Sequence, residues 1–467
     1  MVKKSIFGLL FLFLAYFLLL AFGNSIARFN DYVTPILSII LAIGLVFCYK
    51  YIKLDFNKWL YIAVLSLTVI VPRLLWIITV DITPISDFGV YYELAKQFAE
   101  GTFAGSDYAA MIPHVLGYPF VLSWFFRLFG VSVPVAQIFN IICILISSLL
   151  LWRILATFIS DRMARFAAIL FAIIPSAIFY SSIVSTESLF TMQILLAVYF
   201  FVKALKLEGL RDILFLALSV LILVWANSVR PIAMVILIAE AIYILFQMRD
   251  GRIFKLISIV MMIALFALGS KAVGMVQARV LGVPMVVNSM GDTIYKGANI
   301  EHHGMWNPED SAEFVHVYEN FPHEDLNKIM LQKTWDRIAE NPMASAMHYL
   351  TKCAIIWASD GYGVDWNRIS VEVEGGDYNA EFEVFNERLS NIFYQAMLLL
   401  AALGAILAIR RGKFDGILFA VIFLGFVGIF IISEVQGRYH YPALPFLIGL
   451  AAMGIGELAR IKNTELR

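Results

Sequence analysis

The chain has 467 residues, of which 61% are hydrophobic and 15% charged, and its mean hydropathy is +0.82. Soluble domains carry about 25% charged residues. The composition therefore excludes a soluble globular protein and predicts an all-α polytopic membrane protein. The formal net charge of zero gives no sign of a nucleic-acid partner. The three cysteines, Cys48, Cys143 and Cys353, lack the spacing of a zinc site or a disulfide framework.

Twelve apolar runs meet or approach the length of about 20 residues that a membrane-spanning helix needs. They are Ile6–Phe22, Val33–Cys48, Leu60–Val80, Val135–Phe158, Phe166–Tyr180, Leu189–Ala204, Ile213–Ala226, Ile232–Phe246, Leu256–Val273, Ile392–Ile409, Ile417–Ile432 and Tyr441–Ala459. The first run follows two lysines, as in a signal peptide, but it is long enough to span and no small-residue cleavage site follows. We expect about 12 transmembrane helices, with the first one retained.

Basic residues, such as Arg162 and Arg165, lie in connections that are inner if the amino terminus is inside. These connections have about ten residues or fewer, which leaves no room for a nucleotide-binding domain, and the chain has no GxxxxGK[ST] loop. The same parity places two long segments outside, 81–134 and 274–391. We therefore expect any chemistry on the outer side of the plasma membrane, with an activated donor arriving through the lipid.

The predicted organisation has four parts. They are 1–59, two amino-terminal helices; 60–273, a transmembrane core that includes the outer loop 81–134; 274–391, a second outer segment; and 392–467, the carboxy-terminal helices. The apolar stretches 118–130 and 343–358 are too short to span, so we expect in-plane or re-entrant helices there. The polar stretch 291–304 is rich in glycine and favours a lid or an acceptor-binding loop.

The stretch from Ile85 to Gly101 predicts a helix on the membrane surface. Tyr91, Leu94 and Phe98 recur at the spacing of one helical face, and charged residues fall elsewhere. Asp87 would then lie at the beginning of this helix and face a site. The alternative is that Asp87 only caps the helix by accepting hydrogen bonds from its free amide groups.

Four ionisable residues, Glu187, Arg230, Glu434 and Arg438, lie near the predicted outer ends of spans. Charged groups at membrane depth are costly and are therefore candidates for function. Simpler roles stay open for each of them. Arg438 and Glu434 are spaced to pair with each other, Arg230 can extend its charge to the interface, and Glu187 can bond to neighbouring hydroxyls.

Five short motifs follow one another in order. They are Ser86-Asp87 with Tyr91 and Ala95, Gly117-Tyr118-Pro119, Tyr180 to Ser188, Val229-Arg230-Pro231, and Gly437 to Pro445. Their order resembles the GT-C membrane glycosyltransferases of the protein-mannosyltransferase and aminoarabinose-transferase type, over about residues 60 to 460. Two features depart from that family. The first two predicted spans precede its usual opening helix, and Phe88 stands where the mannosyltransferase branch has the Glu of an Asp-Glu pair.

The resemblance implies a GT-C-like bundle, a polyprenyl-phosphate sugar as donor and Asp87 as the general base on the acceptor hydroxyl. Cations must stabilise the departing phosphate. Candidates for that role are Arg230, Arg438, Lys296 and Lys352. Candidates for substrate binding are Tyr91, Tyr92, His114, Tyr118, Glu187, Glu434 and Tyr439. We expect no metal and no cofactor beyond the lipid-linked donor.

The function predicted from these observations is that of an inverting glycosyltransferase acting on an extracytoplasmic glycan, lipid or protein acceptor. The alternative from another class is a transporter or flippase of lipid-linked sugars. Against it, the charged candidates lie at span ends rather than at the midplane, and no inverted repeat is visible. A scaffold that only binds membrane lipid would leave the two long outer segments without a purpose.

Overall fold

The computed structural model describes residues 1–467 apart from 207–209, 248–250, 288, 374 and 461–467. Helices, including the 3-10 helices η1 to η3, are the only regular elements in the described residues, which confirms the all-α class. In chain order they are α1 Val2–Phe29, α2 Val33–Tyr51, α3 Lys58–Thr79, α4 Ser86–Glu100, α5 Asp107–Met111, η1 Pro113–Leu116, α6 Gly117–Phe129, α7 Val133–Leu155, α8 Asp161–Ala172, α9 Pro175–Phe179, η2 Tyr180–Ser182, α10 Glu187–Ala204, α11 Leu210–Asn227, α12 Met234–Gln247, α13 Arg252–Leu281, α14 Met290–Gly297, α15 Pro308–Asn320, α16 Leu326–Glu340, α17 Pro342–Thr351, α18 Cys353–Trp357, α19 Tyr362–Glu372, α20 Ala380–Arg411, α21 Ile417–Ile432, η3 Gly437–Ala443 and α22 Leu444–Arg460.

Eight helices in the described part of the chain are long and apolar enough to cross a membrane, or nine if one bent pair counts as a span. The eight are α1, α2, α3, α7, α10, α13, α20 and the continuous stretch of η3 and α22. Of the other predicted spans, 213–226 forms α11, while 232–246 and 417–432 form the shorter apolar helices α12 and α21. The count of about twelve therefore stays a prediction.

The predicted span 166–180 is broken. Helix α8 ends at Ala172, α9 begins at Pro175, and their axes differ by 53°. Pro175 has no amide hydrogen and disfavours helical geometry in the residue before it, so the helix stops there. Arg73, fully buried in α3, donates from Nη1 to the carbonyl of Ala172 at 2.8 Å. A cation thus satisfies the broken end of α8.

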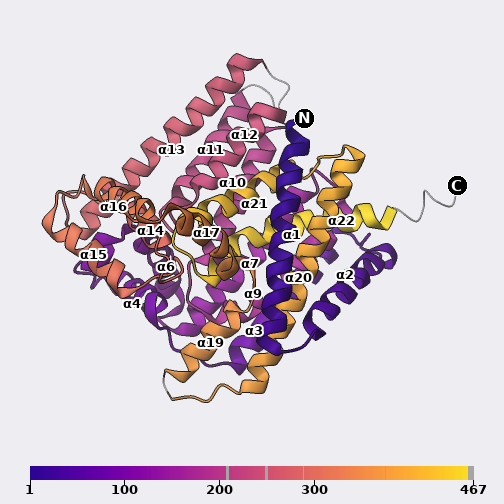
Figure 1. The fold of residues 1–467 in the computed structure, drawn as a ribbon, viewed down its shortest axis with the longest axis horizontal. Coiled ribbons are helices and arrows are strands. Elements are labelled where there is room, and N and C mark those ends of the chain that lie inside the picture. The colour runs from indigo at the N-terminus through magenta and orange to yellow at the C-terminus, as the bar shows by residue number, and fades with distance from the viewer. Residues whose placement is uncertain (207–209, 248–250, 288, 374, 461–467) are drawn as a thin grey trace.

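The first two helices pack against the carboxy-terminal helices rather than standing apart as a separate unit. Figure 1 shows α1 crossing the front of the bundle, and α1 and α2 both contact α20. Arg28 pairs with Glu387 at 3.0 Å, and Arg388 pairs with Asp31 at 2.5 Å. Deeper in the bundle, Gln395 donates to the hydroxyl of Ser25 at 2.7 Å. Residues 461–467 of the predicted last unit lie outside the described residues.

The helix predicted over 85–101, within the predicted outer segment 81–134, is present as α4, while its position on the membrane surface stays a prediction. Its last residue precedes Gly101, whose φ of 73° is left-handed and ends the helix. Tyr91, Leu94 and Ala95 on its apolar face are buried within the protein, and α4 packs on α6. Helix α6 has 13 residues, about 20 Å in length, and is shorter than the roughly 30 Å hydrocarbon core.

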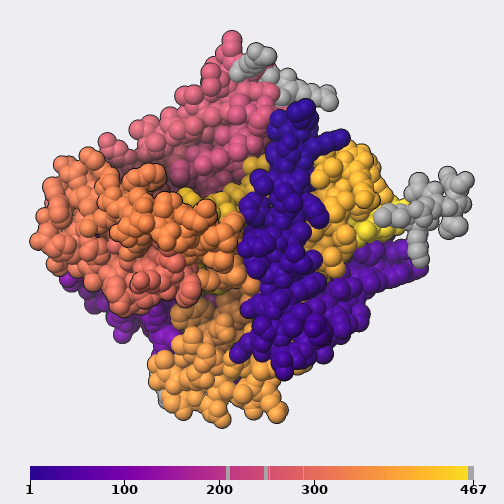
Figure 2. Space-filling view, viewed as in Figure 1, coloured from indigo at the N-terminus to yellow at the C-terminus, as the bar shows by residue number. Residues whose placement is uncertain are grey.

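The flanking helices extend into the predicted second outer segment, 274–391. Helix α13 continues to Leu281, and α20 begins already at Ala380. Between them lie the short helices α14 to α19. Figures 1 and 2 show α14, α15 and α16 gathered at one side of the bundle beyond the end of α13. This segment contacts the bundle next to the loop between α21 and η3, because the amide of Glu434 donates to the carbonyl of Thr293 at 2.7 Å.

Candidate active site

Four of the predicted residues form one line of alternating charge. Arg438 Nη2 donates to Asp87 Oδ2 at 3.1 Å, and Arg438 Nε lies 3.6 Å from Glu187 Oε1. The same Glu187 oxygen accepts from Arg230 Nη1 at 2.5 Å. Tyr108 donates its hydroxyl to the other oxygen of Asp87 at 3.2 Å. Residues up to 351 positions apart in the chain thus meet in one cluster.

The cluster is open at its Asp87 end and closed at its Glu187 end. The side chain of Asp87 is 36% exposed, whereas those of Arg438 and Glu187 are 6% and 2% exposed. A buried charge is tolerated when it is paired, and Glu187 has two cationic partners. The Asp87 carboxylate is therefore accessible to a substrate, and the charged side chains that hold it in place are buried.

Asp87 is not the residue that caps helix α4. The residue that caps α4 is Ile85, and it makes no side-chain hydrogen bond to the helix. Asp87 lies in the first turn and bonds to Tyr108 and Arg438, so the structure gives it a role other than the capping alternative. Ser86 has a left-handed φ of 52°, which costs a non-glycine residue about 1–3 kcal/mol. Such strain is typical of functional sites.

Arg438 is held by aromatic rings. Its guanidinium carbon lies 4.7 Å from the ring centre of Phe88 and 5.2 Å from that of Trp366. Its Nε is buried and donates no hydrogen bond within the described residues. Glu434, the alternative partner, instead accepts from the hydroxyl of Tyr439 at 3.0 Å. Arg438 is therefore positioned firmly and keeps a free donor.

Arg230 follows α11, and its place depends on a close approach by Gly117. A Cβ atom on Gly117 would lie 2.1 Å from the carbonyl oxygen of Ser228, two residues before Arg230. Arg230 Nη1 also donates to Thr186 Oγ1 at 3.2 Å, and its guanidinium lies 5.1 Å from the Tyr439 ring centre. The glycine of one predicted motif thus supports the arginine of another.

We expect Gly117→Ala to destabilise the protein and weaken the site together. The added methyl group has no space against backbone, so the 228–230 turn must move, at a cost of about 1–3 kcal/mol. The thermal midpoint in detergent measures the first effect. Gly428→Ala is the matched control, because a Cβ there meets nothing within 4 Å. Equal midpoints for the two variants would contradict this explanation.

The remaining predicted substrate-binding residues divide into two groups. His114 and Tyr91 adjoin the charged cluster: burial, followed by the charge of Arg230, lowers the pKa of His114 to about 4, and burial raises the pKa of Tyr91. His114 is therefore neutral at pH 7. Tyr118 packs edge-on against Tyr91, with ring centres 5.9 Å apart, and its hydroxyl donates to Asn140 in the core at 3.2 Å. Tyr92 packs on Phe126.

The two lysines predicted to bind the donor phosphate are already engaged within the protein. Lys296 pairs with Asp292 at 2.7 Å inside α14. Lys352 donates to the carbonyls of Gly297 and Ser433 at 2.9 and 2.8 Å, so it joins the second outer segment to the loop before η3. Among the described residues, Lys352 forms no ion pair with a carboxylate. Lys352 thus secures the segment that carries Glu434, whereas Lys296 is paired locally within α14.

The buried ammonium of Lys352 predicts a pH-dependent stability. Burial lowers its pKa to about 7, whereas an unfolded lysine has its ordinary value near 10.4. Between these two pKa values the unfolded state binds more protons than the folded state, so the free energy of unfolding rises with pH above about 7. As pH falls to 7, this contribution to stability is lost. We expect Lys352→Met to remove this rise in the thermal midpoint between about pH 6.5 and 9. The exposed Lys328→Met is the control, and a slope unchanged by Lys352→Met would contradict the assignment.

One member of the site, Tyr108, carries no signal in the sequence. Tyr108 reaches Asp87 from the short helix α5, and Trp366 covers Arg438 from α19. A second cluster supports η3 from behind: the fully buried His440 bonds through Nε2 to Asp360 at 2.8 Å, and Asp360 accepts from Ser176 at 2.5 Å. Aromatic and hydroxyl residues are frequent at membrane interfaces, so their type alone does not distinguish them.

Residues 113–272, about a third of the chain, match the family described as dolichyl-phosphate-mannose-protein mannosyltransferase. The family resemblance predicted from the sequence is confirmed. The matched segment contains the glycine motif, Glu187 and Arg230, whereas Asp87 and Arg438 lie outside it. No curated protein matches the chain.

Among solved structures, the chain is similar to the archaeal oligosaccharyltransferase AglB from Archaeoglobus fulgidus in complex with an inhibitory peptide and a dolichol-phosphate. The TM-score is 0.49 at 10% identity, over 88% of this chain and 51% of that one. The apo form of the Archaeoglobus fulgidus oligosaccharyltransferase gives a TM-score of 0.48 at 12% identity, over 89% and 52%. The chain spans about half the length of these structures.

Proposed function

We propose that this chain is an inverting glycosyltransferase that moves a sugar from a polyprenyl-phosphate donor to a hydroxyl group of an extracytoplasmic acceptor. The observation that carries the proposal is the accessible Asp87 carboxylate beside two guanidinium groups that share one buried glutamate. A base for the nucleophile and cations for the leaving phosphate are the two parts that such a transfer needs. The match of residues 113–272 to a mannosyltransferase family supports this choice of reaction.

In the proposed step the acceptor oxygen attacks the anomeric carbon of the donor sugar. Asp87 takes the proton from the acceptor hydroxyl as the new carbon–oxygen bond forms. The bond from the anomeric carbon to the phosphate oxygen breaks, and its electron pair stays on the phosphate, which gains one negative charge. A single displacement of this kind inverts the configuration at the anomeric carbon.

The two arginines are suited to receive that charge. Guanidinium groups present forked donors that match phosphate oxygens, and Arg438 Nε is a buried donor with no hydrogen-bond acceptor among the described residues. Glu187 keeps the two cations close together and prevents their mutual repulsion. Trp366 and Tyr439 contribute flat faces beside the cations, on which a sugar ring can stack.

The lipid tail of the donor accounts for the membrane character of the chain. A polyprenyl chain reaches the cluster from the bilayer, and the short inner connections leave no place for a soluble nucleotide donor. The segment 433–435, held by Lys352 and by backbone bonds to Thr293 and Gly304, brings Glu434 beside Tyr439. We infer that this segment faces the acceptor, because the second outer segment lies over it.

The test is a transfer assay with the purified chain in liposomes. Polyprenyl phosphates carrying different radiolabelled sugars are supplied with crude envelope extract, and label in the acceptor fraction is counted. We expect transfer from one sugar, with release of unlabelled polyprenyl phosphate and an inverted linkage. If no donor transfers while labelled lipid crosses the bilayer faster than in empty liposomes, the chain is a flippase and the proposal is wrong.

A further inference from the structure

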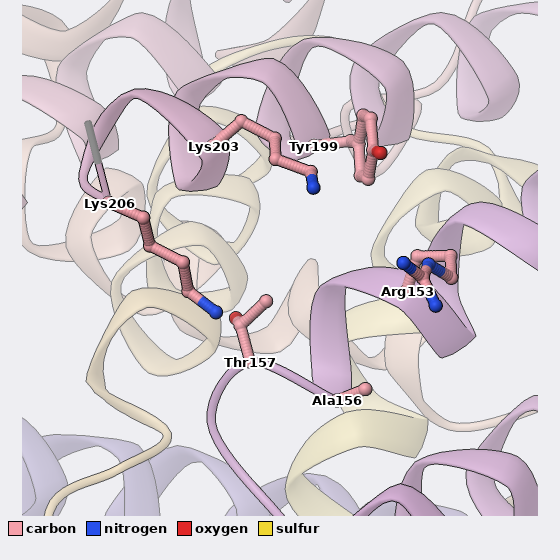
Figure 3. Close-up of a pocket in the computed structure, with 6 residues that line it drawn as sticks. All are labelled: Arg153, Ala156, Thr157, Tyr199, Lys203 and Lys206. Atoms are coloured by element: carbon pink, nitrogen blue, oxygen red, sulfur yellow. The ribbon is translucent and has the colours of Figure 1, made fainter. Parts of the chain in front are cut away.

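A hollow lies at the ends of α7 and α10 that are far from the Asp87 cluster (Figure 3). Its volume is about 160 Å³, and it is lined by Arg153, Ala156, Thr157, Tyr199, Lys203 and Lys206. Glu187 begins α10, and Lys203 lies near its end. At 1.5 Å per residue, the two are about 24 Å apart along the helix. The hollow therefore opens at the membrane face opposite the candidate active site.

Three of the six lining residues are cations that have no partner of opposite charge in the described residues. Within the part of the chain that the structure describes, Arg153, Lys203 and Lys206 form no ion pair and their side chains donate no hydrogen bond. Arg153 lies 5.3 Å from the Trp152 ring centre, and Lys203 lies 5.5 Å from that of Tyr199. Both rings belong to the same helix as their cation, so neither contact joins the helices.

Two neighbouring arginines at the same face do bind other groups of the protein. Arg162 donates to the carbonyls of Tyr49 and Ile52 at 2.7 and 2.5 Å, and Arg165 pairs with Asp161 at 2.7 Å. Arg165 also donates to the carbonyls of Leu54 and Phe56, so these two arginines fasten the beginning of α8 to the end of α2 and the loop after it. The excess of basic residues on an inner face accounts for the presence of cations, but it does not account for three of them turned toward one hollow.

The lining also offers hydroxyl groups. In Figure 3, Lys203, Lys206 and Tyr199 face Arg153 and Thr157 across the hollow, and the ammonium of Lys206 points toward Thr157. Thr157 donates its hydroxyl hydrogen to the carbonyl of Ile154 at 2.7 Å, so its oxygen remains able to accept. A forked guanidinium with two ammonium groups and hydroxyls around a small space is a typical phosphate environment.

We propose that this hollow binds a phosphate group, carried by an anionic lipid headgroup of the leaflet opposite the active site or by a soluble phosphate. The volume is smaller than the roughly 300–1,000 Å³ of sites for drug-sized ligands, which favours a single headgroup over a sugar nucleotide. The rim lies at the level where helices leave the bilayer, which is where lipid phosphates lie. This inference is independent of the proposed transfer reaction.

The test measures lipid binding to the full chain by native mass spectrometry, with dioleoyl phosphatidylglycerol, dioleoyl phosphatidylcholine and inorganic phosphate as probes. The variant carries Arg153→Gln, Lys203→Gln and Lys206→Gln. The matched control carries Lys50→Gln, Lys53→Gln and Lys58→Gln, which removes three exposed cations from the same face. Ala156→Trp is a second variant, which fills the hollow and leaves every charge in place, so that membrane topology is unaffected.

We expect the wild type to prefer phosphatidylglycerol over phosphatidylcholine. Since each cation near an anionic surface contributes severalfold to binding, the first variant should bind phosphatidylglycerol about 10-fold more weakly or worse. Ala156→Trp should weaken it as well, and the control should not. A second supporting result is that the chain binds inorganic phosphate, shows no preference between the two lipids, and loses phosphate binding in the same two variants. The hollow would then be a phosphate site for a soluble ligand. Equal loss in the control, or no preference and no phosphate binding, overturns the proposal.

Discussion

Asp87→Asn is expected to lower the rate of sugar transfer by about 10²–10⁴-fold, the contribution of a positioned general base. The substitution keeps the size of the side chain and can still accept from Tyr108 and Arg438. It removes the ability to take the acceptor proton. Donor binding should change little, because the donor phosphate is assigned to the arginines. Initial rates with saturating donor measure the loss.

The control for Asp87 is Glu93→Gln, which removes another carboxylate from α4. Glu93 is exposed and, within the described residues, its side chain accepts only from Gln97, at 3.3 Å, so its loss should leave transfer intact. If the transfer rate of Asp87→Asn stays within threefold of the wild-type rate, Asp87 is not the general base. Equal losses in both variants would point to the electrostatics of the helix rather than to proton transfer.

Arg438→Gln should lower transfer by about 10²–10³-fold, the effect of removing one donor that stabilises charge in the transition state. Arg438→Lys should restore little, because one ammonium cannot contact Asp87, Glu187 and a phosphate oxygen in the forked geometry of a guanidinium. Unlike Asp87→Asn, both changes should also weaken donor binding. Binding of a non-transferable polyprenyl-phosphate analogue distinguishes the two classes of variant.

The matched control for Arg438 is Arg388→Gln. It breaks another arginine–aspartate pair, in which Arg388 donates to both oxygens of Asp31 at 3.0 and 2.5 Å, where α1 and α2 meet α20. A fall in thermal midpoint that both variants share reports lost packing. Only the loss of transfer rate in Arg438→Gln that exceeds the loss in Arg388→Gln measures the contribution of Arg438 to the reaction. Wild-type donor binding in Arg438→Gln would refute the phosphate-binding role.

The hydropathy pattern alone predicts most of the helices, because a bilayer accepts only segments whose backbone groups bond within themselves. The four charged candidates and Asp87 were also predictable. Charge at membrane depth is costly enough to be retained only for a purpose, and the parity of the spans places all five on one side. The segment match at 113–272 agrees with the motifs that the sequence displays there.

The order of partners within the cluster was decided by tertiary structure. Glu434 and Arg438 have a spacing that favours a local pair, yet Arg438 contacts Asp87 and Glu187, and Glu434 contacts Tyr439. Local spacing predicts a pair only where both residues lie in one regular helix, and Glu434 lies in the irregular segment before η3, which begins at Gly437. Tyr108 escapes prediction because nothing in its own neighbourhood marks it.

What the sequence determined by itself is the class of protein, the helices and the set of charged residues at one face, since each follows from local composition and from the cost of charge in lipid. What only the tertiary structure decided is which charges pair, that Lys352 bonds to the carbonyls of Gly297 and Ser433, and that Gly117 supports Arg230. These outcomes depend on contacts between residues distant in the chain. Their energies come from burial and geometry, which composition and spacing do not contain.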